Sequence, residues 1–397
     1  MRLLMVYLIY LNSVYLIECE EISEHPDIYL NIVQLIQKYG YPVEEHEITT
    51  EDGYLLTMFR IPHGKQGSGV NSKPILLMHG LFGQSENYIV SGMINASLAY
   101  YLADRDYDVW LGNARGNQHS RKHINLDPDK RDFWIFSYHE IGVFDLPAKI
   151  DYILETTKKK KLYYVGHSQG GTAFYIMNSE RPEYQDKIAL ASLLAPAGYM
   201  SHFKHPLILP FIKVAKDIEE LLDVMNIHEF PPKEISLSNI LRGFCVRELR
   251  LDLCLSLYHV LLNGGNSGEF DKRMFMLIAK FVPSVAKRQM LHYAQAVTKG
   301  FRRYDFGSKM NLRRYRSQDP PDYQIRNITA PIAIYYSSAD ILVNSRDAEI
   351  TCGSLPNCVR KYKIPNPKWT HLDFIFGINA EKMYHEPLYK FLEKYKT

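Results

Sequence analysis

The sequence carries little net charge, few cysteines and no long apolar run beyond its first residues. Its 397 residues hold 47 Lys and Arg against 44 Asp and Glu, a formal net charge of +3. That balance supplies no basic stripe to neutralise nucleic-acid phosphates, so no nucleic acid is expected as a partner. Five cysteines are too few for a disulfide-built scaffold. The 46% apolar content allows a large buried core and excludes a disordered or collagen-like chain.

Long apolar segments are confined to the N-terminus. Residues 1–19 (MRLLMVYLIYLNSVYLIEC) place a basic residue before an apolar run that two polar residues interrupt. This pattern is typical of a secretory signal, with a membrane anchor or a buried helix as the alternative. No later segment reaches the roughly 18 apolar residues that a membrane span needs, so none is expected once the signal is removed. Sequons at Asn95 and Asn327 fit the same secretory route.

Short apolar strands alternate with longer helical patterns over most of the chain. An alternating stretch on both sides of Asp52-Gly53 predicts an opening β-hairpin. The repetition that follows predicts a mostly parallel central sheet with helices on both faces, an α/β fold. The predicted strands are 74–78, 107–111, 161–165, 188–194, 331–336 and 359–364, and the predicted helices lie near 140–156, 169–179 and 374–395.

The alternation stops between residues 199 and 325. Helical periods continue there without intervening strands, and the stretch is far longer than an ordinary loop, so it must form a structured cap or a separate domain. We therefore divide the chain into a signal (1–19), a first core part (20–198), a helical cap and lid (199–325) and a second core part (326–397).

A nucleophile motif lies between a predicted strand and a predicted helix. Residues 166–171 read Gly-His-Ser-Gln-Gly-Gly directly after the strand 161–165. In a G-x-S-x-G motif the serine occupies a sharp, strained turn, which closes because small residues lie two positions before and after it. In this context the motif is the signature of the α/β-hydrolase fold, and it predicts Ser168 as the nucleophile. The other interpretation is an ordinary glycine turn.

A serine hydroxyl needs a base to accept its proton and an acid to orient that base. In α/β hydrolases the acid follows a late strand and the histidine comes last. Asp340 lies in the turn after the strand 331–336 and is the expected acid, with Asp347, in a segment predicted to turn helical, as its rival. His371 follows the strand 359–364 and is the expected base.

Two backbone amides are expected to bind the oxyanion of the tetrahedral intermediate. One belongs to Gln169, directly after the nucleophile, and the other to Leu81, in the loop after the strand 74–78. His79 in that loop and His167 beside the nucleophile could transfer protons, but we expect both to brace the structure. This chemistry needs no metal or cofactor, and none is expected.

With these residues in place, the chain resembles the acid lipase family, which comprises the animal gastric and lysosomal lipases and their insect relatives. The resemblance covers nearly all of the mature length. It implies an α/β-hydrolase fold with a lidded helical cap. It implies that Ser168 is the nucleophile, Asp340 the acid and His371 the base. It carries the oxyanion donors onto Leu81 and Gln169. The shared motifs are Thr50-Glu51-Asp52-Gly53-Tyr54, His79-Gly80-Leu81, Asn113-Ala114-Arg115-Gly116-Asn117, Gly166-His167-Ser168-Gln169-Gly170, Leu194-Ala195-Pro196 and His371-Leu372-Asp373-Phe374.

Two positions depart from the family pattern. Residues 337–344 read Ser-Ser-Ala-Asp-Ile-Leu-Val-Asn, where the family usually has glycines before the acid and Ala-Asp-Pro after it. Thr370 stands where the family usually has an asparagine before the histidine, and we expect this change to be tolerated.

The expected activity is a secreted or lysosomal carboxylic ester hydrolase that cleaves neutral lipid esters, with triacylglycerol as the first candidate, through an acyl-enzyme on Ser168. The helical cap would supply an apolar tunnel and a movable cover. The partner would be a lipid ester at an oil–water or membrane interface. Cholesteryl-ester hydrolysis and acyl transfer are alternatives because the triad is indifferent to the alcohol and the acceptor. A non-catalytic lipid-binding protein on the same scaffold is the alternative outside the enzymes.

The five cysteines divide into one, two and two. Cys19 lies at the signal boundary and either leaves with the signal or remains near a loose N-terminus. The resemblance implies a disulfide between Cys245 and Cys254 in the cap. Cys352 and Cys358 flank a short loop that contains Gly and Pro, and a second bridge could close it.

Overall fold

The computed structural model describes residues 25–67, 72–90, 97–233, 237–245 and 248–395. The predicted signal, Cys19 and the sequon at Asn95 lie outside the described residues. Within the described ranges, no helix combines the length and the apolar character needed to cross a membrane.

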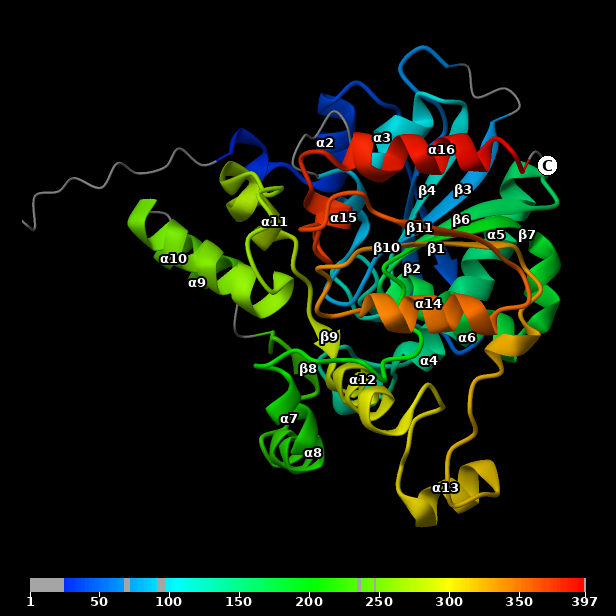
Figure 1. Ribbon diagram of the computed structural model, residues 1–397, viewed down its shortest axis with the longest axis vertical. Coiled ribbons are helices and arrows are strands. Elements are labelled where there is room, and N and C mark those ends of the chain that lie inside the picture. The colour runs from blue at the N-terminus through cyan, green and yellow to red at the C-terminus, as the bar shows by residue number, and fades with distance from the viewer. Residues whose placement is uncertain (1–24, 68–71, 91–96, 234–236, 246–247, 396–397) are drawn as a thin grey trace, which may run out of the picture.

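A mixed sheet forms the centre of the molecule (Figure 1). Its strands lie in the order β1-β2-β4-β3-β6-β7-β10-β11, and β5 pairs with β2. All pairs from β4 to β11 are parallel, while β1 and β2 form an antiparallel edge. The strands are β1 (Glu44–Thr49), β2 (Tyr54–Ile61), β3 (Lys73–Met78), β4 (Tyr107–Gly112), β5 (Lys122–His123), β6 (Leu162–His167), β7 (Ile188–Leu194), β10 (Ile332–Tyr336) and β11 (Cys358–Lys363).

The predicted hairpin joins β1 to β2 and is held to the core by an ion-pair network. Gly53 has φ 91°, a conformation that favours glycine, and its amide donates to the Thr50 carbonyl at 3.0 Å. The motif 113–117 contacts this hairpin through Arg115. The buried Arg115 guanidinium donates to both Asp52, in the hairpin turn, and Asp145. The motifs around Asp52 and Arg115 therefore have a structural role here.

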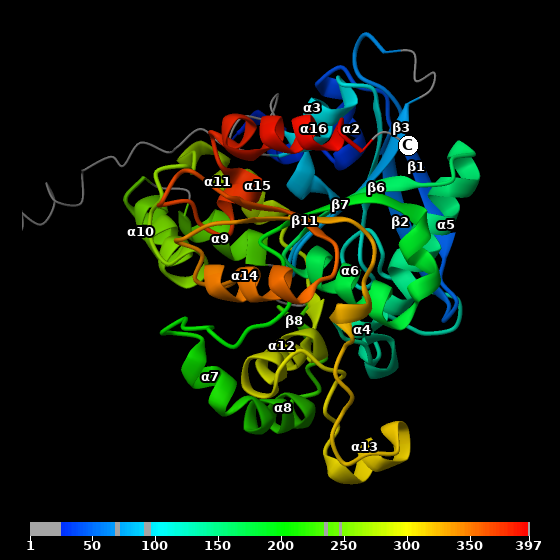
Figure 2. The ribbon, with the colours of Figure 1, turned by 45° about the vertical axis from the view of Figure 1, so that its right-hand side comes forward.

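Alternate residues of each strand pack into cores on opposite faces of the sheet, as the two-residue period of a strand requires. In β3, Ile75 and Leu77 join one core, and Leu76 and Met78 join the other. The first core is covered by α2 (Ile32–Lys38), α3 (Leu98–Ala103) and α16 (Glu386–Leu392). The second is covered by α5 (Leu146–Thr157), α6 (Gln169–Glu180) and α14 (Ser345–Ser354), and Figure 2 shows the two layers of helices on either side of the strands.

The predicted helix over 374–395 is wrong as a continuous element. The chain forms α15 (Asp373–Phe376), then π-helical η10 (Glu381–His385) and α16. The break falls at Gly377, whose extended backbone (ψ 131°) pairs with Phe270 in an isolated antiparallel bridge. The predicted helix near 140–156 is confirmed: α4 (Tyr138–Glu140), π-helical η5 (Ile141–Asp145) and α5 follow one another without a break.

Residues 199–325 are mostly helical and lie beside the core (Figures 1 and 2). A two-stranded sheet of β8 (Glu229–Phe230) and β9 (Val285–Ala286) was not expected from the sequence. The helices of this segment are α7 (Leu209–Lys213), α8 (Ala215–Val224), α9 (Leu237–Cys245), α10 (Glu248–Tyr258), η7 (His259–Asn263), η8 (Lys272–Met274), α11 (Phe275–Lys280), α12 (Lys287–Lys299) and α13 (Ser308–Tyr315). The remaining short helices are η1 (Pro26–Tyr29), η2 (Ser85–Tyr88), η4 (Arg131–Trp134), η6 (Pro182–Lys187) and η9 (Ile325–Asn327).

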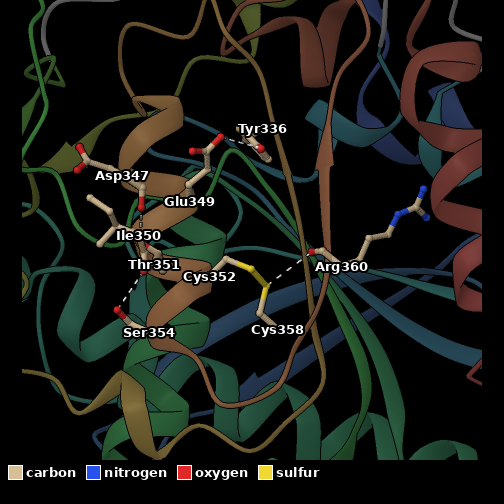
Figure 3. Close-up of a disulfide and its surroundings, with 9 residues drawn as sticks. All are labelled: Tyr336, Asp347, Glu349, Ile350, Thr351, Cys352, Ser354, Cys358 and Arg360. Carbon is tan, nitrogen blue, oxygen red and sulfur yellow. Dashed lines mark hydrogen bonds between the residues drawn. A yellow bond between two sulfur atoms is a disulfide. The ribbon is translucent and has the colours of Figure 1, made fainter.

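Two disulfides join cysteines within the described part of the chain. Cys245 and Cys254 join α9 to α10 in the cap, with their Cα atoms 6.2 Å apart. Cys352 and Cys358 join α14 to β11, with their Cα atoms 5.4 Å apart (Figure 3).

Candidate active site

The predicted catalytic residues follow strands that run in the same direction. Ser168 comes directly after β6, Asp340 lies beyond β10 and His371 lies beyond β11. Because these strands are parallel in one sheet, their carboxyl ends meet at a single edge, where α/β proteins form their binding crevices. The loop that begins at His79 follows β3, which neighbours β6, and so reaches the same edge.

Ser168 sits on a strained turn between β6 and α6. Its φ of 50° and ψ of −111° lie in a region that residues with a side chain rarely adopt. Its amide donates to the Leu194 carbonyl of β7 at 2.9 Å, and its carbonyl accepts from Gly171 N at 2.9 Å. Ser168 is half-buried, so it stays partly accessible at the end of the strand.

The glycines of the motif are required by close backbone contacts. A Cβ on Gly166 would lie 2.7 Å from the carbonyl carbon of Gly170. A Cβ on Gly170 would lie 2.4 Å from the Met78 carbonyl oxygen at the end of β3. Side chains at either position would push the turn away from the neighbouring strand, so the sequence requirement for small residues has a steric origin.

The predicted acid and the predicted base are in direct contact. His371 Nδ1 donates to Asp340 Oδ2 at 2.7 Å, and both side chains are buried. The other carboxylate oxygen of Asp340 accepts the amides of Leu342 and Val343, each at 2.8 Å. The Asp340 carboxylate is thus fixed by three hydrogen bonds. It holds the imidazole in the tautomer that leaves Nε2 free to accept a proton.

Asp347, the alternative candidate for the acid, binds a different histidine. It lies in the first turn of α14, where its Oδ1 contacts His202 Nδ1 at 2.6 Å and its Oδ2 accepts the His202 amide at 2.8 Å. These contacts tie the start of the cap to the core and give the Asp347 carboxylate a partner other than His371.

His167 connects the predicted base to the turn that carries the predicted nucleophile. Its Nε2 donates to the His371 carbonyl at 3.1 Å, and the two rings lie 4.8 Å apart between centroids. Burial, with a smaller contribution from His371, keeps the pKa of His167 well below its usual value, so the ring stays neutral. Its position indicates a bracing role.

The loop after β3 approaches the nucleophile. A Cβ on Gly80 would lie 3.0 Å from Ser168 Cβ, which places Leu81 beside the nucleophile turn. His79 fixes this loop, because its Nε2 accepts from Ala114 N at 3.1 Å and its Nδ1 donates to the Gly80 carbonyl at 2.8 Å. Burial lowers the pKa of His79 to about 4, so it too is neutral near pH 7. Gln169 is the first residue of α6, and its amide has no partner within the helix.

The cap contacts both α6 and the loop after β3. Tyr293 of α12 forms a 3.0 Å hydrogen bond with Thr172 Oγ1, one turn along α6 from Ser168. Phe230 of β8 meets Phe82 of the β3 loop with ring centroids 6.3 Å apart. The cap therefore covers the edge of the sheet at which the candidate triad lies.

Asp373 lies in one of the shared sequence motifs but has no predicted role, and the structure shows its contacts. Asp373 accepts two hydrogen bonds from Thr370, from the amide at 2.6 Å and from Oγ1 at 2.7 Å, and one from Ser267 Oγ at 3.0 Å. Burial raises the pKa of this carboxyl, against the lowering effect of these hydrogen bonds. The threonine that replaces the usual asparagine is thus hydrogen-bonded. In the sequence, the position of Asp373 two residues after His371 is the signal that could have suggested a supporting role.

The remaining sequon is accessible. Asn327 is exposed at the end of η9, and its carbonyl accepts from Gln185 Nε2 at 3.2 Å. Glycosylation at this position stays a prediction.

Comparison with known proteins decides the family. A family profile described as the alpha/beta hydrolase fold matches residues 73–377, and one described as a partial alpha/beta-hydrolase lipase region matches residues 32–92. The chain is 42% identical to Lipase 1 of Drosophila melanogaster over 93% of this chain and 81% of that protein. The chain belongs to the acid lipase family. It is accordingly a carboxylic ester hydrolase of the α/β-hydrolase fold.

Mammalian members of the acid lipase family are similar over almost their whole length. Human gastric triacylglycerol lipase is 35% identical over 91% of this chain and 90% of that protein. Human lysosomal acid lipase/cholesteryl ester hydrolase is 34% identical over 94% and 92%. A crystal structure of a candidate lipase from Sulfolobus solfataricus, 16% identical, superposes with a TM-score of 0.61 over 89% of this chain and 94% of that one. At this identity the structural likeness shows the fold alone.

Proposed function

We propose that this acid lipase hydrolyses neutral lipid esters, triacylglycerol foremost, through an acyl-enzyme on Ser168. The observation that carries the proposal is the bond from His371 to Asp340, which fixes the imidazole in the tautomer that a serine hydrolase needs. The strained backbone of Ser168 at the end of β6 supports the same assignment.

The proposed reaction proceeds in two halves. Ser168 Oγ attacks the ester carbonyl carbon while His371 Nε2 takes the hydroxyl proton, and the amides of Leu81 and Gln169 stabilise the oxyanion. Collapse of the intermediate breaks the bond to the alcohol, which leaves with the proton from His371. Water then attacks the acyl-enzyme with His371 as base, and the fatty acid is released as Ser168 regains its proton.

A lipid surface is the proposed setting for this reaction. The cap exposes large apolar side chains, among them Phe211 of α7 at 64% and Val224 of α8 at 85%. An accumulation of exposed apolar side chains on one part of a protein marks a contact surface. The others on helices of the cap are Leu221, Ile240, Phe244, Leu253, Leu257, Val260, Leu261, Leu262, Met310 and Leu312.

We further propose that the chain enters the secretory pathway, for extracellular or lysosomal use. The apolar N-terminal segment supports this route. The two disulfides favour an oxidising compartment.

A second substrate class is supported by one relative. The human lysosomal protein carries cholesteryl ester hydrolase in its name, and the candidate triad here contains nothing that selects the alcohol. A substrate panel of emulsified triacylglycerol, cholesteryl ester and a phospholipid distinguishes the classes. We expect the fastest fatty acid release from triacylglycerol, and in Ser168→Ala a loss of about 10³-fold or more in kcat. Preference for cholesteryl ester would select the second candidate, and equal activity of Ser168→Ala would reject the mechanism.

A further inference from the structure

A buried cap residue binds both ends of the loop that carries the base. We call residues 366–379 the base loop. Glu269 Oε1 accepts from Asn366 Nδ2 at 2.9 Å, where the loop begins. Its Oε2 accepts from the Asn379 amide at 3.1 Å and from Asn379 Nδ2 at 3.0 Å, where the loop ends. The Glu269 side chain is buried. Its two carboxylate oxygens each bind one end of the base loop.

Backbone contacts join the same two segments. The Glu269 carbonyl accepts from Ile378 N at 2.8 Å, and Phe270 pairs with Gly377 in an antiparallel bridge. This pairing accounts for the extended backbone at Gly377 that interrupts the C-terminal helix. The base loop is therefore closed against the cap by main chain as well as by side chain.

A second pair of contacts reaches the residues next to His371. Ser267 Oγ donates to Asp373, and Asp373 accepts from the amide and hydroxyl of Thr370. Thr370 and Asp373 flank the His371-Leu372 dipeptide. The cap segment 267–270 is therefore hydrogen-bonded to a residue two positions from His371. On the acid side, a Cβ on Gly264 would lie 2.5 Å from Ile341 Cγ2, directly after Asp340.

We propose that Glu269 is a positioning residue that holds His371 in register with Ser168, and that the cap is thereby part of the catalytic support. The inference rests on the proposed role of His371. Burying a carboxylate is unfavourable unless hydrogen bonds replace its water, and the partners that do so here lie in the base loop. The loop and the cap segment must therefore form together. A displacement of about 1 Å at a catalytic group can cost on the order of 10² in rate.

The test uses three variants of the full chain and a soluble short-chain ester, which needs no lipid surface. Glu269→Ala removes the contacts to both ends of the loop. Glu269→Gln keeps one acceptor oxygen and so one end. Asp271→Ala is the matched control, because Asp271 directly follows the cap segment 267–270 but its carboxylate binds Arg273 within the cap.

We expect Glu269→Ala to lower kcat about 10²-fold and to change KM by no more than about twofold. The kcat of Glu269→Gln should lie between those of Glu269→Ala and the wild type. The rate of fluorophosphonate labelling of Ser168 should fall in parallel, at a temperature where circular dichroism shows each variant folded. Asp271→Ala should keep kcat within about twofold.

A folded Glu269→Ala with wild-type kcat, or an equal loss in Asp271→Ala, would overturn the proposal. Should Glu269→Ala not fold, Glu269→Gln decides, since an unchanged kcat there overturns it as well. Failure of the proposed function is a separate result. It would show as a wild-type chain that neither hydrolyses the ester nor labels on Ser168.

Discussion

Asp340 and Asp347 are both buried aspartates paired with a histidine, and their partners separate their roles. Asp340 contacts His371, while Asp347 contacts His202 at the start of the cap. Asp340→Asn should lower kcat on the order of 10⁴-fold, because the amide no longer holds the imidazole in the reactive tautomer. Asp347→Asn should leave kcat nearly unchanged and lower the melting temperature. Steady-state kinetics with a soluble ester measure both, and the reverse pattern would reassign the acid.

His292 gives the folded chain a dependence on pH. It is buried in α12, where Nε2 donates to the Arg302 carbonyl at 2.9 Å and Nδ1 contacts Ser137 Oγ at 3.0 Å. Burial lowers its pKa to about 3. The unfolded chain binds a proton at this residue near pH 6.5 and the folded chain does not, so the free energy of unfolding falls as pH drops from about 6.5 toward 3.

The effect of His292 can be isolated with a neutral replacement. Between pH 7.5 and pH 5 this residue should lower the free energy of unfolding by about 2 kcal/mol. Gln at this position can donate and accept without titrating, so His292→Gln should reduce the pH dependence by that amount. Urea unfolding at the two pH values measures the difference. Equal pH dependence of the variant and the wild type would contradict the assignment.

At the residue scale, the sequence predicts groups whose chemistry follows chain order. Ser168, Asp340 and His371 can be predicted because a motif fixes the first and the strand pattern locates the others. The contacts of Glu269 and Asp373 cannot be predicted in this way, because they join distant positions in the chain. Ser267 and Asp373 lie 106 positions apart in sequence, and no local pattern marks such a pair.

At the element scale, the Cys352–Cys358 disulfide stabilises the junction between α14 and β11 (Figure 3). On the chain-entropy model, closing so short a loop contributes about 2 kcal/mol. Replacing both cysteines by serine should lower the free energy of unfolding by about that amount. Denaturant unfolding at pH 7 measures it, with the Cys245→Ser/Cys254→Ser variant for comparison. Unchanged stability would show that the bridge does not form in solution.

Strands were predicted better than helix limits, for a physical reason. A central parallel strand such as β7 is buried on both faces, and its uninterrupted apolar run is visible without knowledge of the rest of the fold. The C-terminal helix has a helical pattern throughout, but pairing between Gly377 and the distant Phe270 breaks it. The two-residue strands β8 and β9 form by pairing with each other, and each is too short to show an alternating pattern in the sequence.

At the scale of the whole molecule, the exposed apolar side chains of the cap separate action on lipid surfaces from action on dissolved esters. Phe211→Asp with Val224→Asp should lower hydrolysis of emulsified triacylglycerol about tenfold, because charge at these positions opposes contact with lipid. Hydrolysis of a soluble ester should be unaffected. Ile124→Asp, at an exposed apolar residue of the core, is the control. Equal losses on both substrates would argue for a folding defect.

The mostly helical character of residues 199–325 could be expected from the end of the strand–helix alternation, but the way in which this segment meets the core could not. The contacts from Tyr293 to Thr172, from His202 to Asp347 and from Ser267 to Asp373 each join residues far apart in the chain. They depend on the three-dimensional path of the cap. A helical period in the sequence identifies which residues share a face, and it does not identify what that face contacts.

The central claim is that Ser168 is the nucleophile of a lipid ester hydrolase, and covalent labelling tests it most directly. A fluorophosphonate reacts when an activated serine oxygen attacks phosphorus and fluoride leaves, and peptide mass spectrometry then locates the adduct. The folded wild-type chain should carry one adduct, on the peptide that contains Ser168, and Ser168→Ala should carry none. A folded wild-type chain that takes up no label at Ser168, or that is labelled at another serine, would contradict the account.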